Sequence, residues 1–574
     1  MVSFFSSQNT SRKTQERGSR LGDPHSYPDR RGVLRSLIES FISLFIAVLL
    51  FRTFAAEGYM ISTGSMAPCL LGFHKRVECP TCATTFSFGV AYDTDEEGQD
   101  IELARGRTRA ICPNCGQRGI DVSDVPRNHG DQLLVNKQSY LYHTPQRWEV
   151  VVFRNPSKAT EAYVKRVVGM PGEQVQLSEG NILIDGVIAR KNLSCQRAMR
   201  IPVHDNNHQS KQTSQTLPHW TPVAEDAVEM SNTPNSSSWK SVENGFVLHQ
   251  GNERRPDREP FHWVKYSHRI RAGGLHETSV PLGRWPKDLQ PSSDFTEGLR
   301  YDQKQGTLSC LGVLSDQMAQ KITNLTDDRP FHSAIAELCE KSHTTPLIDD
   351  YGYNVQDGGA VPNPVRDVMF SCQLHWQSRA GEFAIQMTDG ENNFTIIFNA
   401  GQHEIRLFVG NAEEPVATGA WPEKFSKHSP IIEVSLFDQQ LLVAVNGELL
   451  IDPWLYETPR GTPVPLNAIR FGGRGLDLRI DQLNVYRDVY YTSARARHGV
   501  NRPYTLGPDE FFMLGDNSPV SHDSRRWDDA PVHRSLLLGK PFLVHLPSKP
   551  GSLRIGDHEM HLRIPDTERI KFLR

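Results

Sequence analysis

The chain has 574 residues, which is room for several domains at about 100–200 residues each. Hydrophobic residues make up 38% and charged residues 23%, a composition typical of soluble globular protein over most of the length. The formal net charge is −4, and no long basic block follows the N-terminal tail, which excludes a general nucleic-acid binder. No nucleic-acid partner is therefore expected.

The N-terminal part combines a basic tail with an apolar segment. Residues 1–32 are polar and rich in Arg and Ser, which predicts a disordered cytoplasmic tail. Residues 33–56 are largely apolar, and a helix over 36–54 would be about 28 Å long. The basic excess before them predicts a single transmembrane helix at 33–56, with the following chain outside the cytoplasm. A cleaved signal peptide and a buried core helix are the alternatives.

Four of the nine cysteines form two C-P-x-C pairs, at Cys79/Cys82 and Cys112/Cys115. Two such knuckles indicate a zinc-ribbon-like insertion over 73–127. Four thiolates suit a tetrahedral structural zinc with no open coordination position. Disulfide pairing is the alternative, because this segment is predicted to lie outside the cytoplasm.

Strand-like runs dominate the rest of the chain, so the predicted fold class is mainly β. Residues 193–345 have weak periodicity and are interpreted as an irregular insertion of loops and isolated strands. Residues 346–491 alternate apolar and polar positions in many short runs, for example over 368–376. That alternation, with Asn446-Gly447 as a hairpin turn, predicts an inserted antiparallel β-sandwich of the jelly-roll type.

Three separated segments carry residues suited to chemistry: 62–68, 163–173 and 515–525. A serine in a Gly/Pro-flanked loop, such as Ser65, is by itself usually a turn residue. A lysine within an apolar strand, such as Lys165, most often lies at the strand end and points to water. Neither segment alone identifies a reaction.

Together these segments resemble the conserved boxes of bacterial type I signal peptidases. The nucleophile box has the form S-x-S-M-x-P, and Thr63 stands at its first serine. The lysine box has the form Y-x-K-R-x-x-G-x-P-G-D, and Glu173 replaces its final aspartate. The box G-D-N-x-x-x-S-x-D-S-R matches 515–525 throughout. A weaker box of the form G-D-x-x-x-V-x-K also matches, at Gly130, Asp131, Val135 and Lys137.

The resemblance implies a serine endopeptidase of the bacterial cytoplasmic membrane that cuts signal peptides from exported preproteins after small residues at −3 and −1. Its antiparallel β catalytic domain would comprise 57–72, 128–192 and 500–574. Ser65 would be the nucleophile and Lys165 the general base, with no cofactor needed for catalysis. The lysine must be neutral to accept a proton, and burial would lower its pKa toward that state.

Further roles follow from the same resemblance. The Thr63 hydroxyl and the Ser65 N–H would bind the oxyanion, Ser521 would hydrogen-bond Lys165, and Asp523 and Arg525 would form a supporting ion pair. A triad of Ser65, His522 and Asp523 is disfavoured, because adjacent residues on an extended strand point to opposite faces. The substrate would add as a strand along four residues: Tyr59, Ile61, Tyr163 and Val164.

The segment 346–491 resembles laminin-G or concanavalin-like domains, which often bind carbohydrate. A carbohydrate partner, a protein partner and a spacer role are all open, because fold does not fix function. Two rival functions are an inactive, surface-anchored binding protein and a self-cleaving Ser–Lys regulator. The intact set of Ser65, Lys165 and Ser521 argues against the first. The apolar anchor argues against the second.

Overall fold

The structure is a computed structural model. It describes residues 30–50, 56–90, 93–94, 100–101, 109–209, 218–223, 239–249, 260–269, 277–289, 299–354, 362–377, 381–399, 401–422, 424–425, 429–555 and 558–573. Two units separate along the chain, Met1–Ala56 and Glu57–Arg574, and each is described by itself. The described chain is mainly β, as predicted.

The first unit contains one helix, α1 (Arg30–Leu50). Its apolar side chains are exposed, with Phe41 at 73% and Phe45 at 63% of full accessibility. None of the described helices is both long enough and apolar enough to cross a membrane. The predicted transmembrane helix at 33–56 is therefore not confirmed. Residues 51–55 and the tail before Arg30 lie outside the described residues.

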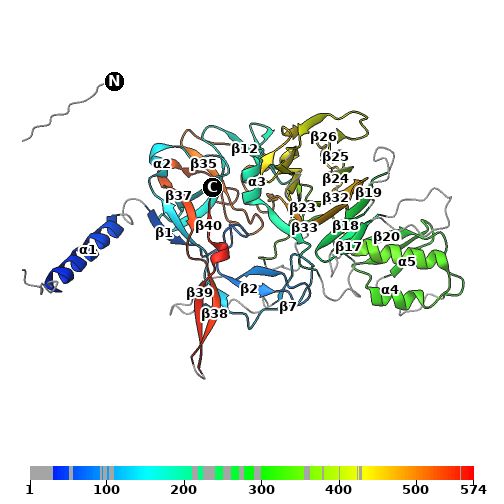
Figure 1. The fold of residues 1–574 in the computed structure, drawn as a ribbon, viewed down its shortest axis with the longest axis horizontal. Coiled ribbons are helices and arrows are strands. Elements are labelled where there is room, and N and C mark those ends of the chain that lie inside the picture. The colour runs from blue at the N-terminus through cyan, green and yellow to red at the C-terminus, as the bar shows by residue number, and fades with distance from the viewer. Residues whose placement is uncertain are drawn as a thin grey trace, which may run out of the picture. The chain divides into compact units, whose positions relative to one another are not determined.

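The second unit begins with an eight-stranded antiparallel sheet whose strands come from three distant parts of the chain (Figure 1). Its order is β1-β9-β37-β10-β11-β35-β36, and β40 pairs with β37. The strands are β1 (Ala56–Met60), β9 (Gln132–Asn136), β10 (Val150–Arg154), β11 (Ala162–Gly169), β35 (Glu510–Leu514), β36 (Val532–His533), β37 (Leu537–Val544) and β40 (Lys571–Phe572). The runs Val150–Phe153 and Phe511–Leu514 are fully buried, because both faces of these strands are covered.

A four-stranded sheet, ordered β14-β13-β12-β34, adjoins it. Its strands are β12 (Gln174–Ser178), β13 (Asn181–Ile184), β14 (Val187–Ile188) and β34 (Tyr504–Thr505). Pairing of Gln174 with Thr505 brings the chain before residue 192 next to the chain after residue 500. A long insertion can therefore begin and end at one place on this sheet.

Between those points lie a nine-stranded and a seven-stranded sheet, here called the sheet pair, which share one hydrophobic core. The first has the order β17-β18-β33-β23-β28-β29-β30, with β15 beside β33 and β31 beside β29. The second has the order β16-β19-β32-β24-β25-β26-β27. One of its edge strands is β27 (Ala417–Ala420), and β30 (Glu448–Leu449) and β31 (Trp454–Leu455) belong to the first. The longest strands of the sheet pair are β23 (Val368–Trp376), β24 (Glu382–Thr388), β25 (Asn393–Asn399), β26 (Glu404–Val409), β28 (Ile431–Ser435), β29 (Gln440–Val445), β32 (Ile469–Arg474) and β33 (Leu478–Arg487). Alternate side chains of β23 enter the core, as their sequence pattern predicts.

Strands from the segment interpreted as irregular also join the sheet pair. They are β15 (Ile201–Asp205), β16 (Trp220–Pro222), β17 (Trp239–Val242), β18 (Gly245–Leu248) and β19 (His262–Tyr266). β18 pairs with β33, and β19 pairs with β32. Trp220, Trp239 and Tyr266 bury their rings in the common core. The sheet pair thus begins well before residue 346, because these short strands are specified by long-range pairing rather than by local alternation.

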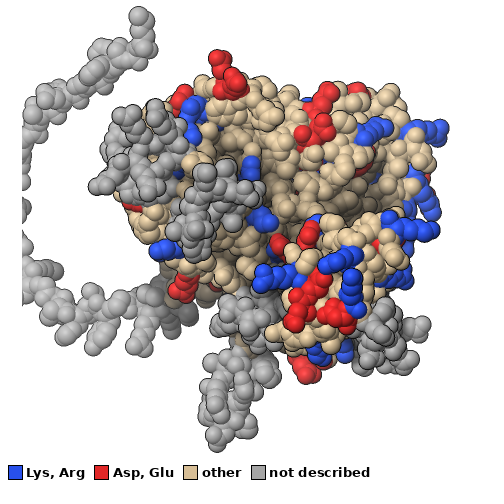
Figure 2. All heavy atoms as spheres, turned by 90° about the vertical axis from the view of Figure 1, so that its right-hand side faces the viewer, with Lys and Arg blue, Asp and Glu red and all other residues tan. Residues whose placement is uncertain are grey.

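The second unit also contains a two-stranded hairpin of β38 (Ser548–Ile555) and β39 (His558–Pro565), and two smaller three-stranded substructures. β2 (His74–Glu78), β3 (Thr85–Gly89) and β8 (Arg127–Asn128) form a sheet beside the cysteine pairs. β20 (Glu277–Pro281), β21 (Leu299–Asp302) and β22 (Thr307–Leu311) form another, covered by α4 (Asp316–Thr323) and α5 (Arg329–Ser342) (Figure 1). Figure 2 shows acidic and basic side chains intermingled on the face it presents, without an extended patch of either sign.

Candidate active site

Ser65 and Lys165 lie within hydrogen-bonding distance although they are far apart in sequence. Lys165 Nζ donates to Ser65 Oγ at 2.8 Å and to the carbonyl oxygen of Val164 at 3.1 Å. Lys165 lies on β11, where its neighbours on β10 and β11 are largely buried, and it is only 4% exposed. Burial lowers the pKa of Lys165 to about 8, against the opposing effect of nearby Asp523.

The loop that carries Ser65 is held from two sides. Within the loop, Ala67 N–H donates to the carbonyl of Gly64 at 3.1 Å. From the segment 515–525, Asn517 N–H donates to the carbonyl of Ser65, and the Asn517 side chain donates to the carbonyl of Gly64, both at 3.0 Å. These bonds fix the backbone on either side of Ser65 Cα, and so limit where its hydroxyl can lie.

The arginine beside Lys165 anchors the same segment. Arg166 forms a bidentate ion pair with Asp516, at 2.8 Å and 2.6 Å, and both residues are almost completely buried. Arg166 also donates to the carbonyl of Trp148 at 2.5 Å. Because Arg166 follows Lys165 on β11, this pair locks β11 to the loop that in turn holds Ser65.

Asp523 and Arg525 form a second buried ion pair. Two bonds join them, at 2.9 Å and 2.7 Å, and both side chains are 0% exposed. Burial alone would raise the pKa of Asp523, but the Arg525 guanidinium outweighs it and holds that pKa below its usual value. Asp523 also accepts the N–H of Gly515 at 3.1 Å. Its carboxylate is thereby committed to Arg525 and the loop, not to a histidine.

Ser521 differs from its expected arrangement. Its side chain is fully buried, and its hydroxyl makes no hydrogen bond to Lys165 among the described residues. The hydroxyl instead lies beside the Asp523 carboxylate and helps to lower its pKa. Lys165 donates instead to Ser65 and to Val164. The expected hydrogen bond between Ser521 and the lysine is therefore not formed among the described residues.

The other expected site residues lie around the Ser65 loop. Thr63 is exposed, and neither its hydroxyl nor the N–H of Ser65 is hydrogen-bonded within the described chain. Ile61, Tyr59 and Val164 belong to one hydrophobic cluster. Tyr163 belongs to another, where its ring lies 6.4 Å from that of Phe153. The four residues thus line two faces of the sheet, as alternation along β11 requires.

Three residues that sequence reasoning missed reach this site from the insertion. Tyr353 donates to the carbonyl of Phe73 at 2.9 Å, and Tyr351 donates to the carbonyl of Asp516 at 2.8 Å. Asn354 exchanges two hydrogen bonds with the side chain of Asn517, each of 2.7 Å. The only signal in the sequence is the local run Tyr-Gly-Tyr-Asn, whose aromatic and amide groups are unusual for a linker.

Gly64 allows Tyr353 of the insertion to approach the Ser65 loop closely. A Cβ atom at Gly64 would lie 2.2 Å from Tyr353 Cε1, well inside van der Waals contact. Glycine is therefore required where the insertion meets the loop.

The four paired cysteines converge into one cluster. Cys79 Sγ lies 3.6 Å from Cys115 Sγ, and Cys82 Sγ lies 3.6 Å from Cys112 Sγ. All four sulfur atoms lie within 4.8 Å of one another, and none is in a disulfide. The separations exceed the 2.05 Å or so of a disulfide bond, and they fit four thiolates around one tetrahedral ion.

Comparison with known proteins confirms the resemblance to bacterial type I signal peptidases. Residues 124–254 match the family described as signal peptidase, peptidase S26. The chain is 44% identical over 64 residues to signal peptidase I of Leptolyngbya laminosa, covering 10% of this chain and 31% of that protein. It is 25% identical over 147 residues to signal peptidase I of Rickettsia bellii, covering 26% and 38%. The chain thus spans about a third of the length of these relatives.

Among solved structures, a Bacillus subtilis protein of unknown function with a galectin-like fold is similar to 21% of this chain. The identity is 11%, 71% of that protein is covered, and the TM-score is 0.18. A likeness at this level carries no argument about the function of the sheet pair.

Proposed function

We propose that this chain is a signal peptidase, a serine endopeptidase that hydrolyses exported preproteins after small residues at −3 and −1. The observation that carries the proposal is the 2.8 Å approach of buried Lys165 Nζ to Ser65 Oγ. A serine hydroxyl is a weak nucleophile until a base removes its proton, and a neutral amine at this distance can do so.

The proposed mechanism uses the lysine in its neutral form. Neutral Nζ keeps two hydrogens and one lone pair, so it can still donate to the Val164 carbonyl while accepting the proton of Ser65 Oγ. Ser65 then attacks the scissile carbonyl, and the protonated Lys165 gives its proton to the leaving amine as the C–N bond breaks. The mature protein leaves with its new amino terminus, the acyl-enzyme remains, and Lys165 is neutral again. Water, activated by the same lysine, hydrolyses the ester.

The oxyanion formed in each step needs hydrogen-bond donors. The Ser65 N–H and the Thr63 hydroxyl are both uncommitted within the described chain, which supports this role. Ser521 enters the proposal as a buried polar group beside the loop, rather than as a partner of the lysine.

Substrate binding is proposed to occur by strand addition. β11 pairs with β35 only from Arg166 onward, so Tyr163 and Val164 have no strand partner on that side among the described residues. β1, which carries Tyr59, lies at the edge of the same sheet. An extended peptide could hydrogen-bond to either backbone, with its side chains in apolar surroundings.

Attachment to the bacterial cytoplasmic membrane, with the catalytic unit outside, remains part of the proposal. The exposed apolar side chains of α1, such as Leu44 at 61%, support it. Resistance of the full-length protein to carbonate extraction from membranes tests this point. Release of the protein into the soluble fraction would contradict it.

Cleavage of a purified preprotein in detergent tests the proposed reaction. Mass spectrometry of the product should show a mature N-terminus directly after a small −1 residue. A preprotein with a bulky −1 residue should remain uncut. Several well-folded preproteins left intact by the folded protein would instead favour a binding function.

A further inference from the structure

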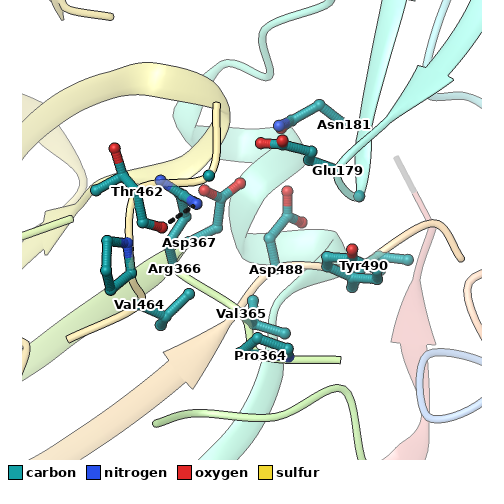
Figure 3. A pocket seen from close by; sticks show the side chains of 14 residues that line it. Glu179, Asn181, Pro364, Val365, Arg366, Asp367, Thr462, Val464, Asp488 and Tyr490 are labelled. Atoms are coloured by element: carbon teal, nitrogen blue, oxygen red, sulfur yellow. Dashed lines mark hydrogen bonds between the residues drawn. The ribbon is translucent and has the colours of Figure 1, made fainter. Parts of the chain in front are cut away.

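A cavity of about 250 Å³ lies where the four-stranded sheet meets the sheet pair (Figure 3). One wall is the turn 179–181 between β12 and β13. Other walls are residues 364–367 before β23, residues 488–490 at the end of β33, and the loop 461–464. The cavity therefore touches both the predicted peptidase domain and its insertion, well apart from Ser65 in the sequence.

Three carboxylates converge on this place. Asp367, Asp438 and Asp488 each offer an oxygen atom, and these atoms lie within 4.8 Å of one another. Asp438 is 3% exposed and Asp488 is 2% exposed, while Asp367 is partly exposed to the cavity. Asp438 N–H donates to Asp367 Oδ2 at 3.0 Å, which holds the first two residues together.

One buried ammonium group neutralises part of this charge. Lys191 Nζ donates to both oxygens of Asp438, at 2.7 and 2.8 Å, and to Asp488 Oδ2 at 2.7 Å. Three carboxylates against one ammonium group leave two negative charges. Arg366 and Glu179 also line the cavity, and their opposite charges cancel in this count. The Arg366 guanidinium donates to the carbonyl of Thr462 at 3.0 Å.

The second oxygen of Asp488 is unsatisfied. Asp488 Oδ1 is buried and has no hydrogen-bond partner within the described chain. In Figure 3 the carboxylates of Asp488, Asp367 and Glu179 turn toward the same space. A buried carboxylate oxygen without a partner costs free energy on the order of 1–3 kcal/mol or more, which a bound cation would offset.

We propose that this cavity binds a hard divalent cation of the calcium class, with Asp488 Oδ1, Asp367 and Glu179 as ligands. All the donors are oxygen atoms, which suits Ca²⁺ rather than Zn²⁺. Ca²⁺ accepts oxygen ligands in flexible geometry, whereas Mg²⁺ demands near-ideal octahedral geometry, so a site built from separate segments of the chain suits Ca²⁺ better. The bound cation would tie the β12–β13 hairpin to the sheet pair, and so fasten the insertion to the sheet that carries it.

Calorimetric titration of the full-length protein with CaCl₂, after treatment with EGTA, tests this proposal. We expect saturable binding of one ion per chain, with a dissociation constant on the order of 10⁻⁴ M or tighter, and a rise in melting temperature. Glu179→Gln and Asp367→Asn should each weaken binding about tenfold or more. Glu179 is exposed on a turn, so its variant should fold even where the Asp367 variant does not.

The control is Glu414→Gln, which removes an exposed carboxylate in the loop after β26 and should leave binding unchanged. No saturable binding up to about 10 mM would overturn the proposal, since even weak extracellular calcium sites are half-filled below that concentration. Calcium binding that survives in Glu179→Gln would place the ion elsewhere and also overturn it. Tighter binding of MgCl₂ than of CaCl₂ would contradict the assignment of the cation.

Discussion

At the scale of single residues, the proposed mechanism places two opposing requirements on Lys165. It must be buried enough to lose its proton near neutral pH, yet polar enough in its contacts to stay close to Ser65. Burial lowers the pKa of Lys165, which meets the first requirement. The hydrogen bond to the Val164 carbonyl meets the second. Among the described residues, no carboxylate accepts a hydrogen bond from its ammonium group, which would have stabilised the charged form.

This arrangement predicts a pH profile. Because only the neutral amine accepts a proton, kcat/KM should rise about tenfold per pH unit below the pKa of Lys165 and level off above about 8. Initial rates of preprotein cleavage between pH 6 and 10 measure it. A profile that rises only near 10.5, the ordinary value for lysine, would contradict the lowered pKa.

Asn354 provides a second residue-scale prediction. Asn354→Ala removes two hydrogen bonds from Asn517, whose side chain steadies the Gly64 carbonyl. We expect kcat to fall about tenfold with little change in KM, because the bonds position the nucleophile and touch no substrate. Asn207→Ala, at an exposed asparagine, is the control. A rise in KM alone would show that Asn354 acts on substrate binding.

At the scale of elements, β11 and the loop 515–525 behave as one piece because the Arg166–Asp516 pair joins them. Asp516→Ala would leave the Arg166 charge buried without a partner, and should lower the free energy of unfolding by about 3–5 kcal/mol. Urea unfolding measures this loss. Glu161→Ala breaks an exposed ion pair with Lys158 and should leave the unfolding midpoint near that of the wild type. Equal losses in both variants would contradict the role assigned to burial.

Strands were predictable where a single element carries its own pattern. Alternation identified β23. β15 to β19 were not assigned to the sheet pair because they are short and contain proline, histidine and lysine. β15, β18 and β19 join it by pairing with β33 and β32, and β17 and β16 join it through β18 and β19. Local pattern cannot reveal a partner more than 200 residues away.

The residues of the candidate site were likewise only partly predictable from the sequence. The motifs named Ser65, Lys165 and the Asp523–Arg525 pair directly, since the family boxes contain them. They could not name Tyr351, Tyr353 and Asn354, which lie in an insertion that the boxes do not cover. The roles of all these residues in catalysis remain predictions.

At the scale of the whole molecule, the insertion begins and ends at adjacent points of the four-stranded sheet. Lys191 near its start donates to Asp488 near its end, at 2.7 Å. The free-energy cost of a long insertion is small when its two ends are fixed side by side, because the entropy lost on closing a loop grows only slowly with its length. The segment 351–354 then lets the insertion support the Ser65 loop instead of only extending from the sheet.

The cysteine cluster makes a prediction about the intact protein. We expect one zinc ion per chain by elemental analysis, and loss of that ion with a lower melting temperature in Cys82→Ser. Cys372→Ser, at a buried cysteine in the sheet pair, should keep the zinc. A metal-free protein in which the four cysteines resist alkylation until reduced would show disulfides instead.

Cleavage of one preprotein by matched variants tests the central claim most directly. Wild type, Ser65→Ala, Lys165→Ala and Lys158→Ala should be purified in the same detergent and compared for folding by their melting curves. The dyad predicts cleavage by the wild type and by Lys158→Ala, whose lysine is exposed and pairs with Glu161, and no detectable cleavage by the other two. Cleavage by folded Ser65→Ala or Lys165→Ala at the wild-type rate would contradict it.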